Sequence, residues 1–224
     1  MTTFLILLIT YVLILQIKNW KVDNLKTSIM DQIEKAVKIL EIGGIIAYPT
    51  ETVYGLGANI FNELAIRRIF EIKRRPINKP ISVAVSSFKM LESIACVSLE
   101  NRKIIRKLLP GPITIILPKN EIVSSLLTGG TDFIGIRFPE NKTAKEIIEK
   151  VGFPITATSA NFSGEKEITD AKDITLSVDF IVNGKCKYKK PSTVFDLVER
   201  RILREGAGIE KVREILYLKE KLEK

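Results

Sequence analysis

The chain has 224 residues, of which 46% are apolar and 27% are charged, and these proportions are typical of one globular domain with a sizeable core. Its 35 Lys and Arg residues outnumber its 26 Asp and Glu residues, and the resulting net charge of +9 favours anionic ligands such as nucleotides, pyrophosphate or RNA. The sequence contains no histidine, which excludes histidine-based triads, histidine-ligated metals and an imidazole general base.

The first 29 residues differ in pattern from the rest of the chain. Residues 4–17 form an almost unbroken apolar run, FLILLITYVLILQI, followed closely by Lys18 and Lys21. This run is shorter than the roughly 20 residues that a helix needs to cross a bilayer, and no small-residue cleavage site follows it. Three interpretations stay open: a start assigned too far upstream, with Met30 as the true first residue; a membrane-associated segment; or a structured extension.

A regular pattern of helices and strands begins near residue 28. Apolar residues at helical spacing over 29–40, after a hydroxyl cap at Ser28, predict a helix that a pair of glycines ends. Residues 45–48 predict a short buried strand. Asn62 is expected to cap a second helix, which runs to about residue 73 before a proline breaks it.

The rest of the chain alternates strand-like and helical stretches. Helices are predicted over 101–109 and 141–151, and a terminal, solvated helix over 209–224. Further strands are predicted over 81–85, 113–117, 133–138, 155–157, 180–182, 193–197 and 202–204. We therefore predict a single-domain α/β fold with one mixed sheet flanked by helices. In this division, residues 1–29 are an extension, 30–215 the catalytic domain and 216–224 a charged tail.

The two cysteines give an indication of the compartment. Cys96 and Cys186 stand far apart in the sequence and have no partner at metal-ligand spacing. Neither a disulfide framework nor a zinc site is therefore indicated, and we expect a reducing, cytoplasmic environment.

Two segments that follow predicted strands are rich in hydroxyl and small side chains. They are PTETVYGLG at 49–57 and TATSANFSG at 156–164. Each could be a plain turn in which Gly, Ser and Asn satisfy their own backbone. Alternatively, the first could hold a small polar ligand through hydroxyl and backbone groups. In the second, Ser159 and Asn161 are two residues apart and could face a ligand or a cation's water shell together.

A basic run, KRRPINK at 73–79, lies between the second helix and the next strand. Cations at the C-terminus of a helix are favoured electrostatically, so a solvated charge run is the simplest explanation. The position of the run near the sheet edge also suits phosphate oxygens, which Arg and Lys bind well. We expect Lys73 and Arg75 to be surface-accessible. Two later segments, PSTVFD at 191–196 and ILREG at 202–206, predict a plain hairpin on their own.

Taken in chain order, PTETVYGLG, KRRPINKP, GIRFP, TSANFSG, PSTVFD and ILREG resemble the YrdC-like family of threonylcarbamoyl-adenylate synthases, over about residues 30–210. The resemblance implies a YrdC-like domain with a basic concave face. It implies that L-threonine, bicarbonate or CO2, and ATP with its Mg2+ yield threonylcarbamoyl-AMP and pyrophosphate. The product would pass to a separate transferase complex for N6-threonylcarbamoyladenosine modification of tRNA.

The resemblance also implies roles for individual residues. The family's Lys-x-Arg and Ser-x-Asn signatures occur here, and we expect them to share one pocket and act in catalysis: Lys73, Arg75, Ser159 and Asn161. The threonine-facing positions are Thr52, Arg137, Ala157 and Thr193. The nucleotide-facing positions are Arg75, Lys79, Ser159 and Arg204. Departures from relatives occur at Ala84, where some have a histidine near threonine, and at Glu167 and Glu205.

Three alternatives to synthase activity stay open. One is an RNA-binding module of the same fold, since the basic concave face suits a double helix. Another is a paralogous subgroup with a different activity, although the intact signatures disfavour it. A domain cut from a larger maturation protein is the third, disfavoured because no accessory zinc-finger or acylphosphatase-like segment is present.

Overall fold

The computed structural model describes residues 29–222, with side chains up to residue 217. The apolar run at 4–17 and the predicted cap at Ser28 lie outside the described residues, so the three interpretations of the extension stay open. Within the described part of the chain, no helix is both long and apolar enough to cross a membrane. A helix is present over residues 29–41, as the apolar spacing predicts.

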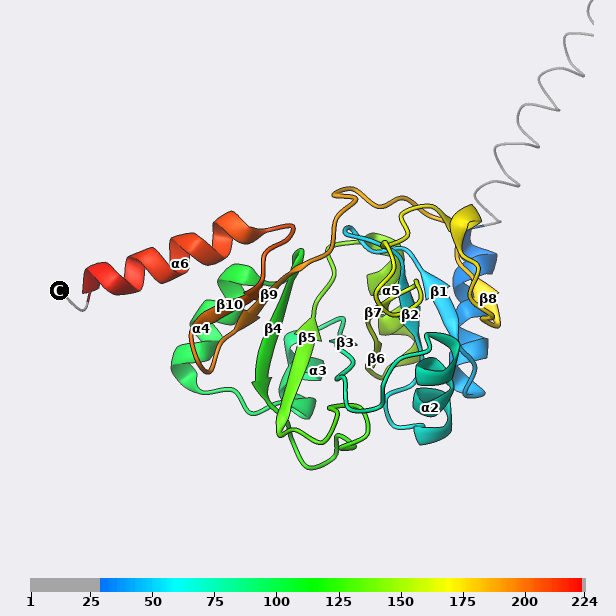
Figure 1. The fold of residues 1–224 in the computed structure, drawn as a ribbon, viewed down its shortest axis with the longest axis horizontal. Coiled ribbons are helices and arrows are strands. Elements are labelled where there is room, and N and C mark those ends of the chain that lie inside the picture. Colours follow the sequence, from blue (N-terminus) through cyan, green and yellow to red (C-terminus); the bar gives the residue numbers. More distant parts are fainter. Residues whose placement is uncertain (1–28, 223–224) are drawn as a thin grey trace, which may run out of the picture.

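The strands form two sheets rather than the single sheet predicted, while the α/β class is confirmed (Figure 1). The four-stranded sheet has the order β7 (Thr158–Ser159), β2 (Gly55–Gly57), β1 (Ile46–Tyr48) and β8 (Phe180–Ile181). The six-stranded sheet has the order β10 (Arg201–Arg204), β9 (Thr193–Asp196), β4 (Ile113–Pro118), β5 (Phe133–Arg137), β3 (Val83–Ala84) and β6 (Ile155–Thr156). Both sheets contain parallel and antiparallel pairs.

The chain passes from one sheet to the other at Ala157. The preceding residue, Thr156, is fully buried, and its hydroxyl donates to the Leu56 carbonyl at 2.7 Å and accepts from the Ala58 amide at 3.0 Å. The Ala157 amide donates to the Ser82 carbonyl at 2.7 Å. These bonds join the edges of the two sheets, and the segments that carry the predicted site meet there.

The helices begin and end where their capping residues stand. Asn62 caps α2 (Glu63–Ile72) by accepting from the Ala65 amide, and Asn141 caps α5 (Lys142–Val151) in the same way. Helix α4 (Leu99–Leu108) also matches its prediction within two residues. Helix α3 (Phe88–Ile94) was not predicted, because its 7 residues are too few to show a helical period clearly.

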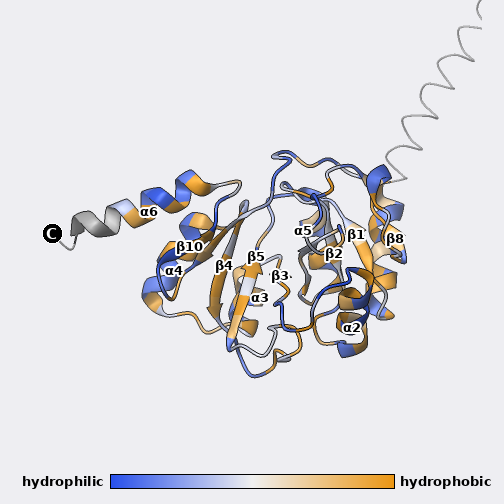
Figure 2. Cartoon of the chain, in the orientation of Figure 1, coloured by the Kyte–Doolittle hydropathy of each residue, from blue (hydrophilic) through white to orange (hydrophobic). Residues whose placement is uncertain are grey.

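Two apolar clusters form the core. The smaller packs the helix over 29–41 and α5 against β1 and β6. The larger lies among β4, β5 and β9 and the helices α2, α3 and α4, and Figure 2 shows apolar residues concentrated on these strands. The terminal helix α6 (Ile209–Leu222) starts on this cluster through the fully buried Val212 and then projects away from the body. Ile215 and Leu216 also pack against the cluster, so the first turns of this helix are partly buried rather than fully solvated as predicted.

Short strands occur in two segments for which the sequence pattern predicts loops. β2 consists of Gly-Leu-Gly and pairs with β7, with Gly55 opposite Ser159. A Cβ at Gly57 would lie 3.1 Å from atoms of Ile46, Tyr48 and Ile155, so these neighbours would have to shift slightly to accept a side chain. Glycine is depleted in strands, which explains why the pattern did not predict this pair.

Candidate active site

A pocket opens where the two sheets meet, and segments from distant parts of the chain line it. The predicted site residues among the lining are Thr52, Arg75, Arg137, Ala157, Ser159 and Arg204. The lining that the sequence did not single out as ligand-facing includes Tyr48, Thr50, Thr114, Pro139, Glu167 and Ser192. The side chains of Lys73, Asn161, Thr193 and Lys79 are not part of it.

Lys73 lies beneath the pocket rather than on the surface, which corrects the expectation of an accessible side chain. It ends α2 and is 1% exposed. Its ammonium donates to the carbonyl of Ser159 and, at 2.6 Å, to the carbonyl of Asn161. Burial, with a smaller contribution from the nearby Arg75 charge, lowers the pKa of Lys73 to about 8. The lysine therefore holds the loop that carries the Ser-x-Asn signature.

Within that loop, Ser159 faces the pocket while Asn161 shapes the backbone. The Asn161 amide group donates to the carbonyls of Phe162 at 3.0 Å and Glu165 at 2.7 Å, and the residue is 6% exposed. The Ser163 amide in turn donates to the Lys73 carbonyl at 2.9 Å. The structure thus brings the four signature residues close together, but Lys73 and Asn161 lie behind the lining rather than in the pocket that the four were expected to share.

Two arginines face the pocket from opposite ends of the sequence. Arg75 donates to the carbonyls of Pro80 at 2.8 Å and Lys79 at 3.3 Å, and Arg204 donates to the carbonyl of Ser192 at 2.9 and 3.1 Å. Burial lowers the pKa of both guanidinium groups. Lys79 is exposed and takes part through its carbonyl.

These two arginines and Lys73 share one electrostatic property. Within the described part of the chain, none of the three forms an ion pair with a carboxylate. The charge of Glu167, which also lines the pocket, acts against the effect of burial on the pKa of Arg204. Backbone carbonyls orient the cations without cancelling their charge, so this side of the pocket is prepared for an anion.

On the other side, Arg137 is paired with a carboxylate. It comes from β5, and its Nη2 lies 2.6 Å from Oε1 of Glu51, with the two side chains 7% and 4% exposed. Its Nη1 donates to the Thr52 hydroxyl at 3.3 Å, and the hydroxyls of Thr50 and Thr52 lie 2.8 Å apart. Glu51 is not among the site residues that the sequence predicts, although a buried arginine in a central strand calls for a carboxylate partner.

The structure does not bring Thr193 to the pocket. Thr193 is fully buried, and its hydroxyl accepts from the Gly206 amide at 3.1 Å. Its neighbours Ser192 and Val194 line the pocket instead, because side chains alternate between the two faces of a strand. Ser192 bonds to the Thr114 hydroxyl at 2.8 Å and is the hydroxyl residue that this segment supplies.

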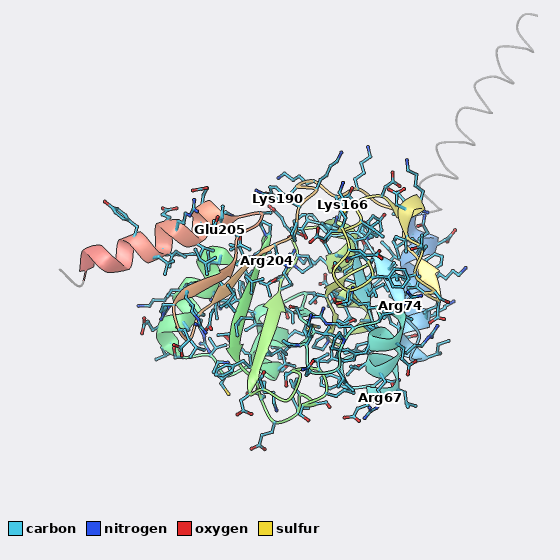
Figure 3. The ribbon with its side chains drawn as sticks, viewed as in Figure 1. Arg67, Arg74, Lys166, Lys190, Arg204 and Glu205 are labelled. Carbon is cyan, nitrogen blue, oxygen red and sulfur yellow. The ribbon has the colours of Figure 1, made fainter. Side chains whose placement is uncertain are left out.

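The positions that depart from relatives differ in their placement. Ala84 lines the pocket beside Arg137, its partner in the parallel pair of β3 and β5. Glu205 lies outside the lining and bonds to Arg213 of α6 at 2.8 Å. Figure 3 shows Arg204 below Lys190, with Lys166 on the same upper side of the molecule.

Comparison with known proteins gives consistent matches. A family model covering Sua5, YciO and YrdC, described as "Telomere recombination", matches residues 38–206. The threonylcarbamoyl-AMP synthase of Pyrococcus abyssi is 39% identical over 174 residues, which cover 75% of this chain and 51% of the relative. The threonylcarbamoyl-AMP synthase of Vibrio vulnificus is 30% identical over 185 residues, which cover 79% of this chain and 100% of the relative.

Solved structures agree with these matches. P. abyssi Sua5 complexed with L-threonine superimposes with a TM-score of 0.76 at 38% identity, covering 80% of this chain and 56% of that one. E. coli YciO superimposes with a TM-score of 0.72 at 30% identity, covering 79% of this chain and 89% of that one. The chain therefore spans about half the length of the P. abyssi relative and the full length of the V. vulnificus one.

Proposed function

The chain belongs to the Sua5/YciO/YrdC family, and from this premise we propose that it is a threonylcarbamoyl-AMP synthase. The proposed reaction converts L-threonine, bicarbonate or CO2, and ATP into threonylcarbamoyl-AMP and pyrophosphate. The observation that carries it is a pocket in which cations held by backbone carbonyls face an arginine held beside hydroxyl groups. The P. abyssi structure complexed with L-threonine supports an amino acid as one occupant.

The first step takes place on the Arg137 side. The uncharged amino group of threonine adds to CO2 and loses one proton to solvent, which gives the carbamate; bicarbonate enters the step as CO2 after losing hydroxide. We assign the threonine carboxylate to Arg137, whose planar fork suits it, and the hydroxyl or amino group to Thr52. Ser192 takes the role that the sequence suggested for Thr193, because Ser192 lines the pocket. Ala157 leaves room where the two sheets join.

The second step takes place on the Arg75 side. A carbamate oxygen attacks the α-phosphorus of ATP, and pyrophosphate leaves. Both reactants are anions, so cations placed in advance stabilise their approach. We assign Arg75 and Arg204 to the phosphate groups and Ser159 to a hydrogen bond with them. Lys73 holds the loop and adds positive charge from beneath.

The chemistry assigned to Mg2+ in this proposal is neutralisation of phosphate charge. The described residues contain no group of three or more His, Cys, Asp and Glu side chains that could hold a metal ion. Mg2+ usually keeps several waters and binds through one or two carboxylates together with substrate phosphates. The pocket fits that mode, with Glu167 as its lining carboxylate, so we propose that the ion arrives with ATP.

A product assay tests the proposal directly. Purified protein with L-threonine, bicarbonate and Mg-ATP is expected to form threonylcarbamoyl-AMP, detected by mass spectrometry, and an equal amount of pyrophosphate. Leaving out either threonine or bicarbonate serves as the control and is expected to abolish both products. Absence of product with all three substrates present contradicts the proposal.

The product would feed tRNA modification through a separate transferase complex, in the reducing cytoplasm that the two free cysteines suit. Direct RNA binding is a second candidate function. The exposed lysines of the segment that leads to Pro191, a lining residue, favour it: Lys185, Lys187, Lys189 and Lys190. A steep fall of RNA affinity with salt, in protein that shows no turnover, would support this alternative.

A further inference from the structure

The buried pair of Glu51 and Arg137 contains polar atoms that its own partners do not satisfy. Oε2 of Glu51 and Nε of Arg137 have no hydrogen-bond partner among the described residues. A guanidinium and a carboxylate often form a fork with two parallel bonds, whereas here one bond of 2.6 Å joins them. Each terminal nitrogen of Arg137 uses one of its two N–H groups, Nη1 with Thr52 and Nη2 with Glu51, so two terminal donors remain on a side chain that is 7% exposed.

The two members of the pair relate differently to the pocket. Arg137 lines it, whereas Glu51 does not, although its neighbours Thr50 and Thr52 do. Residues 51–53 form a bend, which the Thr50 hydroxyl holds by accepting from the amides of Thr52 and Val53. Glu51 thus lies behind the guanidinium and contacts a substrate only through it.

Glu51 is itself held firmly. Its carbonyl accepts from the Tyr188 amide at 2.8 Å, which ties it to the segment that leads to the pocket rim. The preceding Thr50 hydroxyl donates to the Val53 carbonyl at 2.7 Å and accepts from the Thr52 amide at 3.1 Å. A carboxylate on such a fixed backbone restricts where the Arg137 guanidinium can point.

We propose that Glu51 is a positioning residue that holds one arm of Arg137, so that the remaining N–H groups of Nη1 and Nη2 receive the carboxylate of the amino-acid substrate. This inference rests on the proposed function and deepens it. Orientation is the essential contribution, because the charge of Glu51 by itself opposes a second carboxylate. The nucleotide side, whose cations have carbonyl partners, does not depend on this pair.

The experiment compares Glu51→Ala with Glu51→Gln by calorimetric titration of L-threonine and of ATP, and by KM and kcat where turnover is present. The alanine variant removes the carboxylate that holds Nη2 of Arg137, and we expect threonine affinity to fall at least tenfold. We expect ATP affinity and kcat to change less than twofold. Glutamine keeps an acceptor for Nη2, so threonine affinity is expected to stay within threefold. L-Threoninamide, which lacks the carboxylate, is expected to bind the wild type and Glu51→Ala alike.

A matched control uses another Glu–Arg pair. Glu92→Ala removes a carboxylate that lies 3.0 Å from Arg102, outside the pocket, and is expected to leave threonine affinity unchanged. Thermal denaturation establishes that each variant is folded. If Glu51→Ala does not fold, Arg137→Lys replaces it, since lysine keeps the charge without the fork; a tenfold loss of threonine affinity is then expected.

Three results overturn the inference. The first is wild-type threonine affinity in folded Glu51→Ala or in Arg137→Lys. The second is an equal loss of affinity for threonine and ATP, and the third is a loss of threonine affinity in Glu51→Gln as large as in Glu51→Ala. These failures are distinct from failure of the proposed function. Turnover without any effect at Glu51 removes the inference alone, whereas threonine binding without product formation removes the synthase proposal alone.

Discussion

The two sides of the pocket hold their cations in different ways. On the nucleotide side, Lys73, Arg75 and Arg204 donate to backbone carbonyls, which orient them without an ion pair to a carboxylate. On the amino-acid side, Arg137 donates to the carboxylate of Glu51, which orients it and cancels its charge. The partner of a cation therefore decides whether the cation supplies net charge or geometry alone.

This difference matches the charges of the proposed substrates. ATP carries several negative charges, and its binding benefits from cations whose charge has not been neutralised. Threonine is a zwitterion with no net charge at neutral pH, so it needs correctly directed donors more than it needs net charge. The following variants break or sharpen this contrast.

The largest effect is expected from Arg75→Ala. The substitution removes an uncompensated cation from the nucleotide side, and we expect turnover to fall by about 10²–10³-fold, as for other preorganised groups that stabilise developing charge. Pyrophosphate release under saturating substrates measures it. Arg67→Ala, which removes an exposed arginine from the preceding helix α2, is the matched control and is expected to keep wild-type turnover. Near-normal turnover in Arg75→Ala would break the contrast.

The pKa of Lys73 gives the next prediction. Burial lowers this pKa from 10.5 in a free side chain to about 8, so between these values the unfolded chain binds more protons than the folded one. The free energy of unfolding of the wild type, relative to Lys73→Met, is therefore expected to rise by about 2 kcal/mol from pH 8 to pH 10. Urea denaturation at each pH measures the difference.

ATP affinity is expected to fall as the pH rises through the Lys73 pKa. Deprotonation of Lys73 removes one positive charge from beneath the phosphate site. ATP titrations at pH 7 and pH 9 test this, with threonine titrations as the internal control. A threonine affinity that falls in parallel would show that Lys73 serves both sides, contrary to the contrast drawn above.

How far the sequence predicts this site depends on whether the relevant partners are close in the chain. The Lys-x-Arg and Ser-x-Asn signatures are local patterns; Arg75 and Ser159 line the pocket, while Lys73 and Asn161 lie behind it. The burial of Lys73 could not be predicted, because a lysine at a helix end is usually solvated and the loop that covers it comes from much later in the chain.

Strand register limits the prediction in the same way. The segment Pro-Ser-Thr offers two neighbouring hydroxyls, and a shift of one residue exchanges the one that faces the pocket. Pairing of β9 with β4, with Ile113 opposite Thr193, decides in favour of Ser192. The sequence predicts the presence of both strands but carries no signal for that register.

Gly184→Ala tests how the amino-acid side is braced. A Cβ at this glycine would lie 2.5 Å from Cγ of Pro49, and the Gly184 amide and carbonyl both bond to the Tyr54 hydroxyl at 2.9 Å. We expect the free energy of unfolding to fall by about 1–3 kcal/mol, as for other overpacked sites, and threonine affinity to fall more than ATP affinity. Lys185→Ala, at the exposed neighbouring position, is the control; equal losses for both ligands would contradict the prediction.

The smallest effect is expected at Arg74, the cation between Lys73 and Arg75. Arg74 has a φ of 50°, and its guanidinium lies 4.8 Å from the centre of the Phe162 ring, outside the pocket lining. Arg74→Ala keeps the left-handed backbone and loses the ring contact, so a loss of about 0.5–1 kcal/mol in the free energy of unfolding is expected. In Arg74→Gly, relief of the left-handed backbone offsets that loss, and stability is expected within about 1 kcal/mol of wild type. Because Arg74 has no place in the lining, both variants should turn over within twofold of wild type.

If Arg74→Ala instead reduced turnover as strongly as Arg75→Ala, the positive charge of the whole basic run would matter. The contrast between carbonyl-held and carboxylate-held cations would then lose its basis.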